Sequence, residues 1–370
     1  MDSQDPKSLS AMAKELEAVR KETIKSLSIE DYLHLRKVIW VNRLFNFLGI
    51  ATAWIVPNPI SALLMSFVIT SKWTTVAHHV LHKGYDKVPG VPPRYTSHVF
   101  AKGWRRFIDW FDWFLPEAWT YEHNHLHHFF TNEGLDPDAG GYRYGETDRL
   151  NKYSKFMKYV IVIVRSSTWK SWYYSIITIK ALHEKLNFDR RTGYDTYARE
   201  SHLRNFFPYI SYHFVLFPSL FLFIGTKAAV FYLINRVLAE FFANWHGFLI
   251  IVTNHTASDL YLLENRTRNI GEFYWAQILG SCNFRTGGFW NDYFHGYLNY
   301  QIEHHLFPDL PASKYAEIQP VVKSIIEKYG LPYRQESVFT RLGKLVSIIT
   351  QKEKMQIMDM QSMQAHDLSA

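Results

Sequence analysis

Ten of the 18 histidines in this chain of 370 residues fall in three short windows. The windows hold His78, His79 and His82; His123, His125, His127 and His128; and His295, His304 and His305. Neutral imidazoles are good ligands for iron, zinc, copper and nickel, whereas protonated imidazoles so close together would repel one another. The windows therefore predict a metal site. Because eight or so imidazoles exceed what one metal can use, they predict two metal ions.

The spacing within the windows fits helices, because residues three or four apart share one face of an α-helix. His78 and His82 are four residues apart, as are His123 and His127, with His128 about 100° further round the helix. We therefore expect each of these two pairs to direct both imidazoles at one point. The third window has the same kind of spacing in Gln301, His304 and His305.

Four apolar stretches predict the elements that position these histidines. They are residues 38–56, 60–77, 206–224 and 228–252, and each is close to the ~20 residues that a helix needs to cross a bilayer. Only three residues separate the members of each pair, which predicts two hairpins. Nearly all of the 41 Lys and Arg residues lie outside these hairpins, which indicates that the hairpin turns face outside and the rest faces the cytosol. We expect an all-α membrane protein with four transmembrane helices; a soluble helical protein with buried hairpins is the alternative.

This topology brings the histidines to one side of the membrane. His78 begins where the second stretch ends, and His255 lies just beyond the fourth. The other windows lie in cytosolic segments, so all of them can converge at the cytosolic face under a helical cap. Several carboxylates could hold imidazole N–H groups or could be solvated loop charges. They are Asp86, Glu133, Asp136, Asp138, Asp259 and Glu303.

The remaining segments suggest a three-part chain. Residues 1–37 are a polar cytosolic arm, residues 38–340 form the membrane domain and residues 341–370 form a C-terminal tail. Residues 104–118 and 156–182 are amphipathic and predict interfacial helices, while Ser28 and Asp31 predict a capping box. Arg236 and Glu240 are four residues apart and are expected to pair. A single cysteine excludes a disulfide scaffold and a thiolate zinc site.

The formal net charge of +7 suits nucleic acid, an anionic membrane surface or an acidic partner. No basic motif or recognised module supports nucleic-acid binding, and we expect none. The basic cytosolic surface is either a dock for an acidic electron donor or a solvated flank of the membrane domain.

From about His78 to Pro332, the chain resembles the integral-membrane fatty acid desaturases and their hydroxylase relatives. The segment from His78 to His82 resembles their first histidine box, HxxxH, and the segment from His123 to His128 resembles the second, HxxxHH. The run from Gln301 to His305 is similar to the QxxHH third box of front-end acyl desaturases.

The resemblance implies a di-iron centre of two Fe²⁺ ions, held almost wholly by histidine, with O₂ as co-substrate. By motif position, the implied ligands are His78, His82, His123, His127, His128, His304 and His305, with His255 as a further ligand outside the boxes. Three positions depart from the pattern: His79 could replace His78, the amide of Gln301 is a weak ligand that could act through water, and His295 could contribute instead.

The activity implied is O₂-dependent desaturation of a fatty acyl chain, presented as a lipid or an acyl thioester. The sequence has no HPGG haem motif, so a separate electron donor of the cytochrome b5 or ferredoxin type is implied. A membrane di-iron hydroxylase with the same metal site is one alternative. A metal transporter or a haem protein rich in histidine is the alternative that is not an enzyme. The sequence does not specify the chain length, the head group or the position of the double bond.

Overall fold

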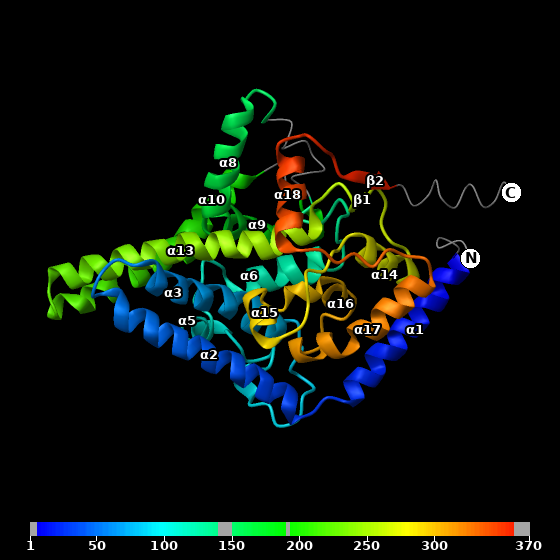
Figure 1. Cartoon of the computed structure of the whole chain (residues 1–370), viewed down its shortest axis with the longest axis horizontal. Coiled ribbons are helices and arrows are strands. Elements are labelled where there is room, and N and C mark those ends of the chain that lie inside the picture. Colours follow the sequence, from blue (N-terminus) through cyan, green and yellow to red (C-terminus); the bar gives the residue numbers. More distant parts are fainter. Residues whose placement is uncertain (1–5, 140–149, 190–192, 359–370) are drawn as a thin grey trace.

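The computed structural model describes residues 6–139, 150–189 and 193–358, and these residues are mostly helical (Figure 1). Among them, the only strands are β1 (Tyr261–Leu263) and β2 (Gln356–Met358), which pair in parallel. The expectation of a helical protein is therefore confirmed, with this two-stranded ribbon as the exception.

Three long helices, α2 (Ile29–Ala53), α3 (Pro59–Ser71) and α13 (Thr226–His255), run side by side, and α3 packs against the other two (Figure 1). Local chemistry sets their ends. The predicted capping box at the start of α2 is confirmed, because the Asp31 carboxylate accepts from Ser28 N at 2.9 Å. At the α2–α3 turn, Asn58 caps α3, and the Asn235 side chain of α13 accepts from Asn58 N at 2.8 Å.

Two helices are long and apolar enough to cross a membrane, judged by length and composition: Pro59–Leu81 and Tyr194–Phe223. They contain the predicted span 60–77 and nearly all of 206–224. The most apolar window of Tyr194–Phe223 is only 11% buried, which suits a helix that faces lipid. The other two predicted spans lie on α2 and α13. These helices have 25 and 30 residues, but charged side chains interrupt them. Two of the four expected spans are therefore supported by length and composition.

The long helices continue into shorter elements that carry the site. The helix of α3 passes through a π-helical turn, Lys72–Ala77, into α4 (His78–Leu81). The run Tyr194–Phe223 contains α10 (Tyr194–Ser201), α11 (Phe207–Ile210) and α12 (Phe217–Ser219). The predicted interfacial segment 156–182 lies on α8 (Lys155–Thr168), a π-helical turn (Trp169–Tyr174) and α9 (Ser175–Glu184).

The predicted helix over residues 104–118 is wrong as a single element. The chain forms a 3-10 turn (Gly103–Arg105) and α5 (Arg106–Asp109), leaves the helix at Trp110, and enters α6 at Pro116 (Pro116–Thr120). Where the helix is interrupted, two aspartate side chains accept hydrogen bonds from backbone N–H groups. Asp109 accepts from Ala101 N at 3.1 Å, and Asp112 accepts from Trp113 N at 2.7 Å. Such local bonds compete with helical ones.

A helical cap lies beside the end of α13 (Figure 1). It contains α1 (Pro6–Lys25), α14 (Ile270–Leu279), α15 (Phe289–Phe294), α16 (Gln301–Leu306) and α17 (Ala312–Lys328). Met12 and Leu16 of α1 are buried in the same core as Leu306 of α16, so the N-terminal arm packs onto the cap. The predicted tail begins inside α18 (Val338–Ile349), which contacts α13; its part from residue 359 lies outside the described residues.

Candidate metal centre

Four segments that are far apart in the sequence carry the histidines to one place. His78 begins α4, and His255 is the last residue of α13. His123 and His127 lie on a π-helical stretch, Tyr121–His127, that follows α6. His304 and His305 of the third window lie on α16, whereas His295 follows the end of α15. π-helical turns are rare and often mark functional sites, and here two of them lead into or carry histidines of the site.

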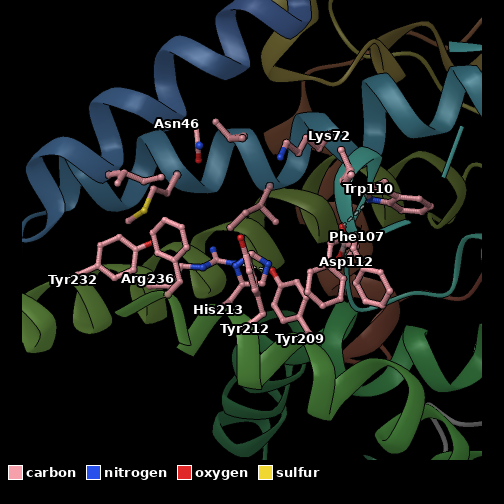
Figure 2. A pocket seen from close by; sticks show the side chains of 17 residues that line it. Asn46, Lys72, Phe107, Trp110, Asp112, Tyr209, Tyr212, His213, Tyr232 and Arg236 are labelled. Carbon is pink, nitrogen blue, oxygen red and sulfur yellow. Dashed lines mark hydrogen bonds between the residues drawn. The ribbon is translucent and has the colours of Figure 1, made fainter. Parts of the chain in front are cut away.

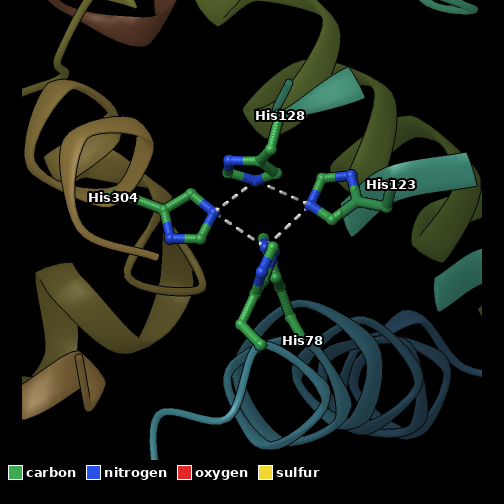
Figure 3. Close-up of side chains that lie close together, drawn as sticks. His78, His123, His128 and His304 are labelled. Atoms are coloured by element: carbon green, nitrogen blue, oxygen red, sulfur yellow. Dashed lines mark hydrogen bonds between the residues drawn. The ribbon is translucent and has the colours of Figure 1, made fainter. Parts of the chain in front are cut away.

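Five buried histidines form the first cluster: His78, His82, His123, His128 and His304. The Nε2 atoms of four of them form a closed ring (Figure 3). Its sides measure 2.9 Å (His78 to His304), 3.1 Å (His304 to His128), 3.2 Å (His128 to His123) and 2.9 Å (His123 to His78).

This ring is small enough for one metal ion to reach all four nitrogens. A point equidistant from four atoms joined by ~3 Å sides lies about 2 Å from each of them, which is close to the bond length between imidazole nitrogen and Zn²⁺. The ring of His82 has its centroid 4.4–5.1 Å from the centroids of all four other rings. His82 therefore belongs to the same cluster and could supply a fifth nitrogen to a metal ion held there.

The second cluster consists of His127, His255 and His305. Their ring centroids lie 4.6–5.0 Å apart. The Gln301 side chain lies beside them, with its Nε2 at 2.8 Å from the Nε2 of His255. The two clusters touch, because the ring of His305 stacks on that of His128 of the first cluster, with centroids 4.3 Å apart.

Hydrogen bonds at Nδ1 turn four imidazoles so that Nε2 is left as the ligand atom. The acceptors are Asp136 Oδ1 for His127 (3.1 Å), the Gly280 carbonyl for His255 (2.9 Å), Gln277 Oε1 for His305 (2.8 Å) and Tyr315 OH for His304 (3.0 Å). A ring that donates through Nδ1 carries its lone pair on Nε2, which is how metal-binding histidines are normally held.

Burial also favours neutral ligands. It lowers the pKa well below the usual 6.5 for His82, His123, His128, His304 and His305. At His127, burial lowers the pKa, but the negative charge and hydrogen bond of Asp136 outweigh this and raise it to about 9. In the metal-free protein, His127 is therefore the protonated member of the second cluster, and a metal must displace that proton.

The residues present fit two metal ions. Four Nε2 atoms that face one another at about 3 Å can direct their lone pairs at one cation placed between them. In addition, the buried Nε2 atoms of His82 and His305 have no hydrogen-bond partner among the described residues. A donor set made of imidazoles suits iron, zinc, copper or nickel rather than Mg²⁺ or Ca²⁺.

The structure brings all eight histidines that the sequence analysis favoured into these clusters, and it leaves two weaker candidates outside. His79 is buried and stacks on the ring of His78, with centroids 5.1 Å apart. His295 donates from Nδ1 to the Asn291 carbonyl at 2.8 Å. Gln301 lies against the second cluster, as described.

The expected pairing of His123 with His127 is wrong. In the π-helical stretch, the backbone N–H of His128 bonds to the carbonyl of His123, five residues back, at 3.0 Å. This wider turn puts His123 and His128 in the first cluster and sends His127 to the second. The expected pairing of His78 with His82 is confirmed.

Of the six carboxylates proposed to hold imidazole N–H groups, Asp136 bonds a clustered histidine and Asp138 lies 3.6 Å from the same His127 nitrogen. Glu303 is buried but bonds Asn283 and Tyr333 instead. The other three carboxylates accept hydrogen bonds from groups outside the clusters. Asp86 accepts from Ser97, Asp259 from Arg341 and Glu133 from the backbone N–H of Thr267.

Sequence reasoning missed several residues around the clusters. Gln277 and Tyr315 orient His305 and His304, and Trp119 stacks on His123 with ring centroids 4.6 Å apart. None of them belongs to a motif. Trp119 lies four residues before His123, and this α-helical spacing was the only sequence signal for any of the three.

Comparison with known proteins agrees with the site. The fatty acid desaturase family model matches residues 52–337. An NADPH-dependent stearoyl-CoA 9-desaturase of Mycobacterium tuberculosis is 26% identical over 351 residues, which cover 90% of this chain and 77% of that protein. A fatty acid desaturase 2-like protein of Mus musculus is 43% identical over 70 residues, or 19% of this chain and 14% of that protein. Fatty acid desaturase 3 of Homo sapiens is 33% identical over 117 residues, or 32% of this chain and 24% of that protein.

The family match covers α3, α13, both histidine clusters and the cap helices α14 to α17. It excludes the reading of the clusters as part of a metal transporter or a haem protein. The chain therefore belongs to the fatty acid desaturase family and is an enzyme of that family.

Proposed function

We propose that this enzyme uses O₂ to introduce a double bond into a fatty acyl chain at two iron ions, with electrons from a separate donor protein. The observation that carries the proposal is the division of eight buried histidines into two touching clusters of five and three. One cluster would hold one iron through five imidazoles. The other would hold the second through His127, His255 and His305, with Gln301 close enough to contribute through its amide oxygen or a bound water.

The irons supply the activation of O₂ that removes hydrogen from an unactivated CH₂, which no side-chain acid or base can do. The chain's own residues hold and shield the site. Hydrogen bonds that the imidazoles donate to Asp136, Gln277 and Tyr315 keep them in the ligating tautomer. The clustered histidines are at most 8% exposed, and Trp119 covers His123, so bulk water is kept from the clusters. Such exclusion limits side reactions.

The proposed enzyme lies in a membrane with four spans in two hairpins and has its metal centre at the cytosolic face. Support comes from the two apolar helices and from the position of His78 and His255 at the ends of their helices. We propose an acyl thioester as the substrate, because a relative that matches 90% of the chain is named as a stearoyl-CoA 9-desaturase. The same name supports NADPH as the final source of electrons, delivered through a donor of the cytochrome b5 or ferredoxin type.

Expression in a host that lacks this desaturation, followed by lipid mass profiling and double-bond location, tests the proposal. We expect a new acyl species two hydrogens lighter than its precursor. The variant His127→Ala should abolish it, whereas His98→Ala should not, because the His98 side chain is 81% exposed and lies outside both clusters. A product heavier by one oxygen would instead identify a hydroxylase. A product unchanged in His127→Ala would separate the activity from the histidine clusters.

A further inference from the structure

A cavity of about 260 Å³ lies between the two helical hairpins, outside both histidine clusters. Its walls come from α2, α3, the turn that follows α3, the segment around Trp110, the run Tyr194–Phe223 and α13. Figure 2 shows Lys72 and Asn46 directed from one side toward a row formed by Arg236, His213 and Tyr212 on the other. The volume is close to the lower end of the range for small-molecule sites, ~300 Å³.

The charges around this cavity do not balance. Arg236 is paired with Glu240 at 2.6 Å, as the sequence predicted, and Asp112 is paired with Lys170 at 2.7 Å. Lys72 is exposed toward the cavity, and no carboxylate of the described residues lies within ion-pair distance of it. The cavity lining thus contains two cations, Lys72 and Arg236, and one carboxylate, Asp112. Arg236 and Asp112 have their ion-pair partners behind the walls, which leaves Lys72 without a close counterion.

An uncompensated ammonium is costly in this position. Lys72 lies in Pro59–Leu81, one of the two helices that are apolar enough to cross a membrane. Ionisable side chains inside membrane helices are expensive and normally have a partner or a function. A bound anion would supply the missing charge, and the amide of Asn46 and the ring of His213 could add hydrogen bonds to it.

The rest of the lining defines the kind of anion. Apolar side chains such as Met65, Val68 and Phe217 share the walls with the polar groups. At the rim, Phe107 and Ile108 are 55% and 62% exposed, so an apolar tail could extend from the cavity toward lipid. A pocket for the methyl end of an acyl chain would need no lysine, arginine or histidine. The lining therefore fits a charged head joined to an apolar tail.

We propose that this cavity binds the anionic head of a single-chain lipid, with Lys72 as the counterion of its carboxylate or phosphate. The site rests on the proposed membrane placement and is separate from the proposed iron chemistry. It is nevertheless connected to the metal centre by packing: Trp110 lines the cavity and meets Trp119 edge-on, with ring centroids 5.5 Å apart, and Trp119 stacks on His123. A lipid in this cavity would thus press on the aromatic support of a metal-cluster ring.

Photocrosslinking tests the site without requiring turnover. The full-length protein, purified with its metals in a neutral detergent, is labelled with palmitate that carries a diazirine near its carboxylate. The labelled peptides are then identified by mass spectrometry. Unlabelled palmitate, lysophosphatidate and methyl palmitate serve as competitors. We expect label on peptides that contain Lys72, Ile108 or Tyr212, and competition by the anions at concentrations ~10- to 100-fold lower than by the uncharged ester. The stronger of the two anions identifies carboxylate or phosphate as the natural head.

Matched variants show whether Lys72 is responsible. Lys72→Met should weaken the labelling ~10- to 100-fold, and Lys72→Arg should restore it. Arg43→Met removes a positive charge from the neighbouring helix α2 outside the cavity and should change nothing. Metal content and elution volume verify the fold of each variant. Equal competition by methyl palmitate, label at other peptides, or failure of Lys72→Arg to restore binding would overturn the site. A failed desaturation assay would leave this result unaffected, and the reverse also holds.

Discussion

Replacing Asp136 by asparagine tests the electrostatics of the second histidine cluster. Asp136 accepts a hydrogen bond from His127 Nδ1 at 3.1 Å and raises the pKa of this imidazole to about 9. The same carboxylate should strengthen the bond from His127 Nε2 to a metal, and losing such a partner typically costs 10- to 100-fold in metal affinity. The negative charge of Asp136 attracts both a proton and a metal ion to His127, and the two compete for the imidazole. The substitution therefore weakens metal binding directly and also weakens the competing proton.

The pH dependence separates the two effects. Below its pKa, His127 must release a proton before it binds metal, so the affinity of the wild-type cluster should rise about tenfold per pH unit up to about pH 9. In Asp136→Asn, the largest of the charges that raise the pKa is gone, while burial and the weaker effects of Asp138 and Glu122 remain. The pKa of His127 therefore falls, and the affinity becomes independent of pH from a lower pH than in the wild type. Between the lowered pKa of the variant and about pH 9, the ratio of wild-type to variant affinity should thus rise with pH, by up to about tenfold per pH unit.

Cobalt(II) binding to the full-length protein, buffered by a competing chelator and followed by visible absorption and metal analysis, measures both slopes. The five-histidine cluster is an internal reference, because burial keeps its rings of His82, His123 and His128 neutral in this pH range. Parallel pH slopes for the wild type and the variant would refute the assignment of the proton to His127. Equal loss of both metals would refute the independence of the clusters.

Three further predictions concern the site and the fold. His305→Ala should lower the iron content from two to one per chain and abolish desaturation, whereas His98→Ala should change neither; metal analysis and lipid profiling measure this. Arg236→Met leaves the buried carboxylate of Glu240 without its ion pair and should cost about 3–5 kcal/mol of stability, seen as a lower thermal unfolding temperature. Ser28→Ala removes a helix cap and should cost about 1 kcal/mol in the same assay.

The identity of the clustered histidines was predictable from the sequence, because imidazoles that suit a transition metal recur at helical spacing in short windows. Their division between two clusters was not. It depends on the extra residue per turn in Tyr121–His127, and nothing in the side chains of this stretch distinguishes a π-helical turn from an α-helical one. The supporting partners Gln277 and Gly280 lie far from the boxes in the sequence and reach His305 and His255 only through the tertiary fold.

A helix was predictable from the sequence where a long apolar stretch is enough to specify it. The stretch 60–77 lies in a long apolar helix as expected. The prediction of one helix over residues 104–118 was wrong because it rested on apolar periodicity alone. The side chains of Asp109 and Asp112 accept hydrogen bonds from backbone N–H groups and end the helix, and the apolar pattern does not reveal this. Lys72 could be noted in the sequence as a charge inside an apolar stretch, but its exposure to a cavity requires the packing of both hairpins.

The π-helical turn has a consequence for how this enzyme tolerates change. Which ion receives each imidazole is decided here by the count of residues along the backbone, since His123 and His128 meet only because the turn between them is one residue wider than usual. Removing one residue from this turn would keep the coordinating side chains yet rotate them out of phase by roughly a quarter of a turn. Insertions and deletions at this position should thus be far less tolerated than exchanges of its non-coordinating side chains.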